Sequence, residues 1–110
     1  TTHVLGNIES VTASNKSVGV GGRLDEKIQG VAERISDAKN KFVAPLSYIG
    51  SEGQNIFRIL EDLCQIVSDL AKSVSTHTHR GGPQPDTSAQ IGGYSIKASE
   101  AKAKLTPIIE

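Results

Sequence analysis

The sequence predicts a mixed β/α fold in which three identical chains wind around one axis, as an intertwined trimeric β-helix followed by a trimeric coiled-coil-like helical bundle. Two repeats of different length carry this prediction. An eight-residue repeat occupies the first third of the 110-residue chain, and apolar residues spaced four and three apart follow between residues 56 and 74. The first predicts short strands joined by tight corners, and the second predicts an amphipathic helix. We therefore expect two parts, residues 1–50 and residues 51–110.

The eight-residue repeat is visible in four successive segments, which start at Val4, Thr12, Val20 and Ile28. Side chains along a strand alternate between its two faces, so the even positions form a small apolar face and the odd positions a polar one. The third position of each segment is always small, and glycine at a fixed place marks a sharp turn. These positions are Gly6, Ser14, Gly22 and Gly30. The repeating unit is therefore one strand and one corner.

Strands this short leave their edges unpaired within one chain, and an unpaired edge readily pairs with another chain. Three identical chains around one axis would close the edges, because each chain supplies strands to the next. The chain has two Phe, two Tyr and neither Trp nor Met, so it has few large residues for a core of its own. Oligomerisation removes that difficulty. We expect a homotrimer, with a core formed in its first part by Val4, Val20, Leu24 and Ile28.

The Val/Ile-x-Gly segments of residues 4–35 resemble the intertwined triple-stranded β-helix of phage tail spikes. That group includes the cell-puncturing device of T-even phages, the central spikes of other contractile tails and the tips of type VI secretion systems. The resemblance implies a rigid structural component of a tail spike, which pierces a cell envelope or forms the hub of a baseplate. It also implies a place in the virion tail or at a secreted tip. Other baseplate or tail-tube proteins and the host outer envelope would be its partners.

The second repeat predicts a helix that supplies the rest of the trimer core, with Ser51 as its N-cap and Glu52 in its first turn. Additional apolar residues at Phe57, Ile59 and Ile66 widen the stripe, which favours more than two helices around the axis or helices packed outside. The alternative is a helix that faces an ordinary globular core. The four-three repeat consists of Ile56, Leu60, Leu63, Val67, Leu70 and Val74.

His77 and His79 are the residues with the clearest potential for metal chemistry. Residues two apart in an extended segment point to the same side, so three chains would offer six imidazoles, which suit Fe, Zn, Cu and Ni. Spikes of the resembling group often hold an iron ion on the threefold axis with such a motif. The resemblance thus implies His77 and His79 as ligands of iron or another transition metal. Two solvent-exposed histidines, or a monomeric site completed by an acidic residue, are the alternatives.

The C-terminal part predicts a loop and a returning helix. Residues 80–94 are rich in Gly and Pro, which is typical of a loop. Ser95 is the candidate N-cap of a helix from Ile96 to Leu105, which Pro107 ends. We expect this helix to run antiparallel along the first one and to cover Phe57, Ile59 and Ile66, and the alternative is a loosely attached tail. The run of Gly50-Ser51-Glu52, the apolar helix of residues 56–74, His77-Thr78-His79 and the proline-rich loop through Asp86 is also similar to the C-terminal part of many phage baseplate spike proteins.

Composition argues against several classes of function. Twelve basic and twelve acidic residues give a net charge of zero without a basic run, so nucleic acid is not an expected partner. No Ser/His/Asp arrangement or phosphate-binding loop is recognisable, so an enzyme is not expected. Cys64 has no second cysteine to pair with, and the missing initiator Met indicates a piece of a longer protein. The alternative function is a generic trimerisation or attachment module of a tail fibre or adhesin stalk.

Overall fold

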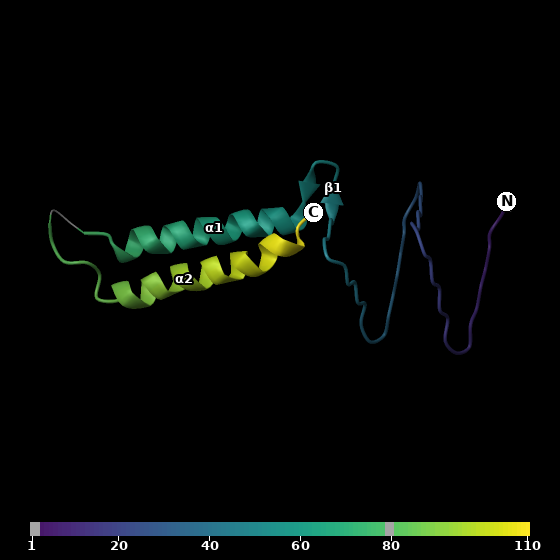
Figure 1. Ribbon diagram of the computed structural model, residues 1–110, viewed down its shortest axis with the longest axis horizontal. Helices are drawn as coiled ribbons and strands as arrows, with labels where there is room; N and C mark the ends of the chain where they lie inside the picture. Colours follow the sequence, from purple (N-terminus) through teal and green to yellow (C-terminus); the bar gives the residue numbers. More distant parts are fainter. Residues whose placement is uncertain (1–2, 79–80) are drawn as a thin grey trace. The chain divides into compact units, whose positions relative to one another are not determined.

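The computed structural model describes residues 3–78 and 81–110, and it divides the chain into two units, residues 1–38 and 39–110. All regular elements of the described residues lie in the second unit. Helices α1 and α2 form a hairpin there, side by side (Figure 1). The elements are β1 (Gly50–Ser51), β2 (Gln54–Asn55), α1 (Ile56–Ser75), α2 (Ser88–Leu105) and a 3-10 turn, η1 (Thr106–Ile108).

The predicted intertwined trimeric β-helix is wrong, because the described residues before Ser47 form no strand and the regular structure is largely helical. The backbone instead bends once every eight residues, so the period of the sequence recurs as bends. A strand requires a backbone partner at ladder distance, and a period along one chain does not supply that partner. The bends lie at residues 5–6, 13–14, 21–22, 29–30, 37–38 and 45–46.

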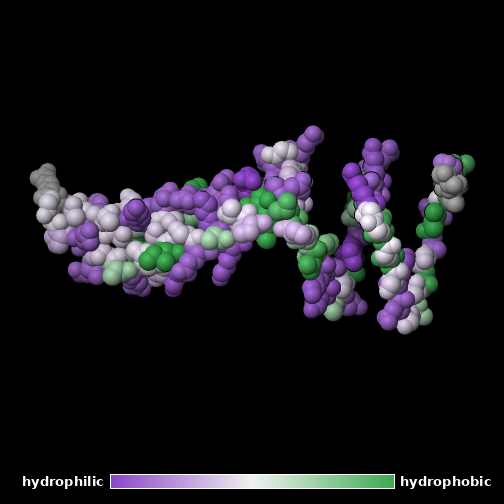
Figure 2. Space-filling model, in the orientation of Figure 1, coloured by the Kyte–Doolittle hydropathy of each residue, from purple (hydrophilic) through white to green (hydrophobic). Residues whose placement is uncertain are grey.

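The described residues of the first unit form no core of their own. Every described residue before Ser47 is exposed, including the four expected core residues of this part. Hydrophobic and hydrophilic atoms succeed one another along the segment in Figure 2. Folding of this unit therefore gains little from burial of apolar surface within one chain. The exposed core candidates are Val4, Val20, Leu24 and Ile28.

Helix α1 begins at Ile56 because Asn55 caps it. The Asn55 side chain accepts the Phe57 N–H at 3.1 Å, and its Nδ2 donates to the Ser47 carbonyl oxygen at 2.9 Å. The first cap bond satisfies an N–H that has no partner inside the helix. The expected cap at Ser51 is wrong, since Ser51 lies in β1 and pairs antiparallel with β2. The tight β1–β2 turn therefore moves the helix start four residues further along the chain.

The C-terminus closes the base of the hairpin. The Ser47 N–H donates to the Ile108 carbonyl at 2.7 Å, and the Glu110 N–H donates to the Ser47 carbonyl at 3.2 Å. These bonds form a parallel bridge between Ser47 and Ile109, and Ile109 is buried. The Ser47 carbonyl thus accepts from both Asn55 and Glu110. The chain before β1, the cap of α1 and the C-terminus are therefore joined at one place.

Helix α2 begins at Ser88, seven residues before the expected cap at Ser95, and it includes Gly92 and Gly93, which composition assigns to a loop. A Cβ atom at Gly92 would lie 3.8 Å from the Ser75 hydroxyl of α1, so this glycine sits against the neighbouring helix. Glycine is a poor helix former by about 1 kcal/mol. Packing against α1 outweighs that local preference.

Gly50 is expected to tolerate no side chain. Its φ is +153°, and a Cβ atom there would collide with the Gln54 carbonyl oxygen of the paired strand. We expect Gly50→Ala to lower the free energy of unfolding by about 1–3 kcal/mol. Gly93→Ala is the control, because nothing lies within 4 Å of a Cβ there and alanine favours the helix by about 0.5–1 kcal/mol. Urea unfolding followed by circular dichroism measures the stability of both variants. Equal losses of stability would contradict the steric requirement for glycine at position 50.

Asn55 is expected to stabilise the hairpin through its cap and its bond to Ser47. Asn55→Ala removes both, and we expect the free energy of unfolding to fall by about 1–3 kcal/mol. Asn55→Ser keeps a capping hydroxyl but is too short to reach the Ser47 carbonyl, so its loss should be smaller. Thermal unfolding at one protein concentration compares the three proteins, and a serine variant less stable than the alanine variant would argue against the cap.

Candidate functional site

Helix α1 carries eight large apolar side chains on one side, and the described residues of the second unit leave them exposed. The six expected core residues of the helix share this side with Ile59 and Ile66. The eight side chains are between 41% and 62% exposed. We call this surface the α1 apolar face. It consists of Ile56, Ile59, Leu60, Leu63, Ile66, Val67, Leu70 and Val74.

Helix α2 packs against the opposite side of α1, which has small residues. Ser68, Ala71 and Ser75 are buried there. The Ser68 hydroxyl oxygen lies 3.0 Å from that of Ser95, 2.9 Å from that of Ser99 and 3.2 Å from the Ser95 carbonyl oxygen. Small side chains let the two helices approach closely, and the hydroxyl groups satisfy one another. The contact inside the hairpin is therefore small and polar.

Longer polar side chains extend this contact along the hairpin. The Thr106 hydroxyl donates to the Glu61 carboxylate, and Lys102 Nζ donates to Gln65 Oε1 at 2.9 Å. Arg58 Nη1 lies 3.7 Å from Glu61 Oε1. A typical intramolecular hydrogen bond contributes only about 0.5–1.5 kcal/mol net. The hairpin is thus held by hydrogen bonds and close packing more than by burial of large apolar groups.

The returning helix is present, but its expected contact with Ile59 and Ile66 is wrong. Both residues remain exposed, whereas Phe57 is half-buried. The residues of α2 that face α1 include Gly92 and Ser95, which fit against Ser75 and Ser68. Large isoleucine side chains would hold the two helices further apart. The size of the contacting residues therefore selects the side of α1 that α2 covers.

The α1 apolar face is large for a chain of this size. Fully burying one such side chain contributes about 1.5–3 kcal/mol, so covering eight that are half exposed would contribute roughly 6–12 kcal/mol. That amount is comparable to the whole stability of a typical domain, about 5–15 kcal/mol. Contiguous apolar surface of this kind marks an interaction site. In the described part of the chain, neither helix is both long and apolar enough to cross a membrane.

The metal site expected at His77 and His79 stays a prediction. His77 is exposed just beyond α1, and its N–H donates to the Val74 carbonyl at 3.3 Å. His79 lies outside the described residues. Among residues 3–78 and 81–110, no group of three or more His, Cys, Asp and Glu side chains is placed to hold a metal ion. Elemental analysis of the purified protein for iron would test this expectation.

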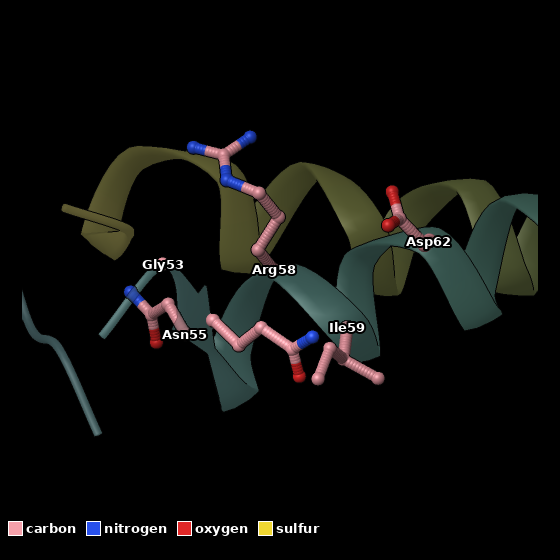
Figure 3. Close-up of a pocket in the computed structure, with 6 residues that line it drawn as sticks. Gly53, Asn55, Arg58, Ile59 and Asp62 are labelled. Carbon is pink, nitrogen blue, oxygen red and sulfur yellow. The ribbon is translucent and has the colours of Figure 1, made fainter. Parts of the chain in front are cut away.

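A shallow depression of about 430 Å³ lies at the start of α1. Arg58 and Asp62 extend from one side of the helix and Ile59 from another (Figure 3). None of these lining residues forms a nucleophile–base pair. Its lining consists of Gly53, Gln54, Asn55, Arg58, Ile59 and Asp62.

The chain is 57% identical over all its 110 residues to a protein of Haemophilus phage HP1 (strain HP1c1), described as "Uncharacterized 58.7 kDa protein in lys 3'region". The match indicates a phage-derived protein. The chain spans only 21% of the length of that phage protein. No family model matches the chain, and no solved structure matches it. Similarity to a phage protein agrees with the phage origin that the sequence resemblance implies, but the match carries no spike or baseplate identity.

Sequence reasoning missed two features of this site, and both had a local signal. Glu61, Ser68 and Ser75 recur every seven residues on the side of α1 opposite its apolar stripe, which marks a second, polar contact. Asn55 directly precedes the first residue of the four-three repeat, which is the ordinary place of an N-cap.

Ser68 is expected to tolerate only a small side chain. Ser68→Ala loses its hydroxyl bonds and should lower the free energy of unfolding by about 0.5–1.5 kcal/mol. Ser68→Leu should lower it further, by about 1–3 kcal/mol beyond the alanine variant, because a large group forces the two helices apart. Ser73→Ala is the control, since Ser73 is exposed on the same helix. Urea unfolding measures all three, and a leucine variant as stable as the parent would contradict the close contact.

Proposed function

We propose that the chain is a structural, self-associating part of a phage tail, in the central spike or baseplate of a contractile tail. The observation that carries the proposal is the α1 apolar face. Its eight large apolar side chains are exposed, whereas the residues buried inside the hairpin are mostly small or polar. A protein that functions as a single chain buries such residues. The similarity to a phage protein supports a phage particle as the assembly concerned.

The first unit supports a structural role for a second reason. Its backbone bends at a fixed interval of eight residues, and its apolar side chains remain exposed between the bends. A regular segment of this kind offers repeated contact points to other protein chains. Covering these contact points would remove exposed apolar surface of the described segment from water.

The proposed unit of assembly is a homotrimer, and its role is mechanical. Ile59 and Ile66 widen the four-three repeat of α1, and a wide apolar stripe can contact more than one neighbouring helix. Burial of these side chains between chains would resist separation under force along the helices. Other baseplate or tail-tube proteins and the host outer envelope are the proposed further partners.

Light scattering after size exclusion tests the assembly. We expect a mass of about 35 kDa, which is three chains of 11.6 kDa each. The apolar face favours association because it is exposed to water, and its width favours more than two helices. A mass of 11.6 kDa at micromolar concentration would refute self-association.

Immunogold electron microscopy of purified particles of the encoding phage tests the location. Antibodies against the hairpin should label the end of the tail, at the baseplate or its central spike. Label on peripheral fibres, together with binding on a glycan array, would favour the attachment module instead. Protein present in the lysate but absent from washed particles would refute a role in the particle.

A further inference from the structure

We propose that the α1 apolar face binds the same face of further copies of this chain, with the α1 helices parallel and in register and α2 on the outside. The inference rests on the proposed self-association and deepens it. It names the surface, the partner and the relative direction of the helices.

The α1 apolar face is available in the second unit, because all eight side chains remain exposed with α2, β1 and β2 in place. None of the eight is charged, so two copies of the face can meet without bringing like charges into the contact. Spacings of four and three let the side chains of one helix fit between those of an equivalent helix. A second copy therefore supplies a complementary surface by symmetry.

The two long edges of the α1 apolar face differ in charge, and this difference favours parallel copies related by rotation about one axis. Cys64 and Ala71 lie along the edge next to α2, and both are at least half-buried. Asp62 and Asp69 lie along the opposite edge and are exposed. In a parallel arrangement with rotational symmetry, the acidic edge of one copy meets the α2 edge of the next. The aspartates of neighbouring copies are then kept apart.

An antiparallel arrangement of two α1 helices would place like charges next to each other. Full overlap of the apolar face would place Ile56 of one copy opposite Val74 of the other. Like edges of the face meet in such a pair, so Asp62 of one copy would lie within one position of Asp69 of the other. Like charges placed together across an interface are unfavourable. The charge pattern of α1 therefore selects the parallel direction.

Parallel helices also agree with the way the chain enters the hairpin. Ser47 is held next to the start of α1 through Asn55 and to the C-terminus through Ile108 and Glu110. Parallel copies would place these entry points at one end of the assembly. The outer side of α2 carries Lys97, Glu100 and Lys104 in exposed positions, which suits contact with water.

Disulfide crosslinking tests the surface and the direction together. Cys64→Ser in the full chain removes the native thiol, and Ile56→Cys or Val74→Cys is then added separately. A disulfide needs Cα atoms about 4.4–6.8 Å apart. Parallel, in-register helices should crosslink each variant with itself under mild oxidation. Residues 56 and 74 would be roughly 27 Å apart along the helix, so two variants refolded together should form no mixed product.

Three results would overturn the inference. Mixed crosslinks without self-crosslinks would show antiparallel helices. No crosslink at either position would show that this face is not the contact. A Glu100→Cys variant, placed on the outer side of α2, is the control for random collision. An equal yield from it would show that the other crosslinks also arise by collision, which would refute the assignment.

A matched pair of charge substitutions tests the surface independently. Leu70 on the α1 apolar face and Ile96 on α2 are both 62% exposed, so replacing either one alters a similar side chain of the single hairpin. Leu70→Glu should reduce the mass measured by light scattering to that of one chain, with helical circular dichroism retained. Ile96→Glu should leave the mass of the parent unchanged.

The two proposals fail in different ways. A parent chain that is already a monomer refutes the self-association in the proposed function. A parent oligomer whose mass is unchanged by Leu70→Glu refutes only the surface assigned here. If a glutamate variant does not fold, the cysteine variants decide, since they keep the parent's size at each position more closely.

Discussion

The close contact between α2 and the small-residue side of α1 is the interaction on which the rest of this structure depends. Ser68, Ala71 and Ser75 let the helices approach, and the hydroxyl groups of Ser95 and Ser99 satisfy that of Ser68. Because α2 occupies this side, the large apolar residues of α1 remain exposed on the outside of the hairpin. The choice of contact inside the hairpin thus creates the surface that is available to other molecules.

This arrangement reverses the usual distribution of side chains. Large apolar residues are ordinarily buried and small polar ones exposed, but the hairpin buries serine and exposes leucine and isoleucine. Hydrogen bonds and close packing hold the hairpin at a modest gain in free energy, so a larger gain remains for association. Neighbouring chains would supply that burial under the proposed self-association, which is the basis for proposing a structural role in a phage particle.

The first unit shows how a repeat can be recognised correctly and still be assigned the wrong structure. The eight-residue period of Val4, Val20 and Ile28 recurs in the backbone as a bend every eight residues. The predicted strands are absent from the described segment, because a strand is defined by hydrogen bonds to a neighbour. Spacing along one chain specifies the corners and the apolar positions, but it carries no information on which backbone groups pair.

The sequence by itself determined the local features of this protein: the bend period, the apolar stripe of α1, and the end of α2 at Leu105 before Pro107. These depend on residues close together in the chain. Tertiary structure decided that α2 begins at Ser88 and continues across Gly92 and Gly93. It also decided which side of α1 is covered by α2. Each of these was settled by contacts between distant segments, where side-chain size and hydrogen-bond partners outweigh local preference.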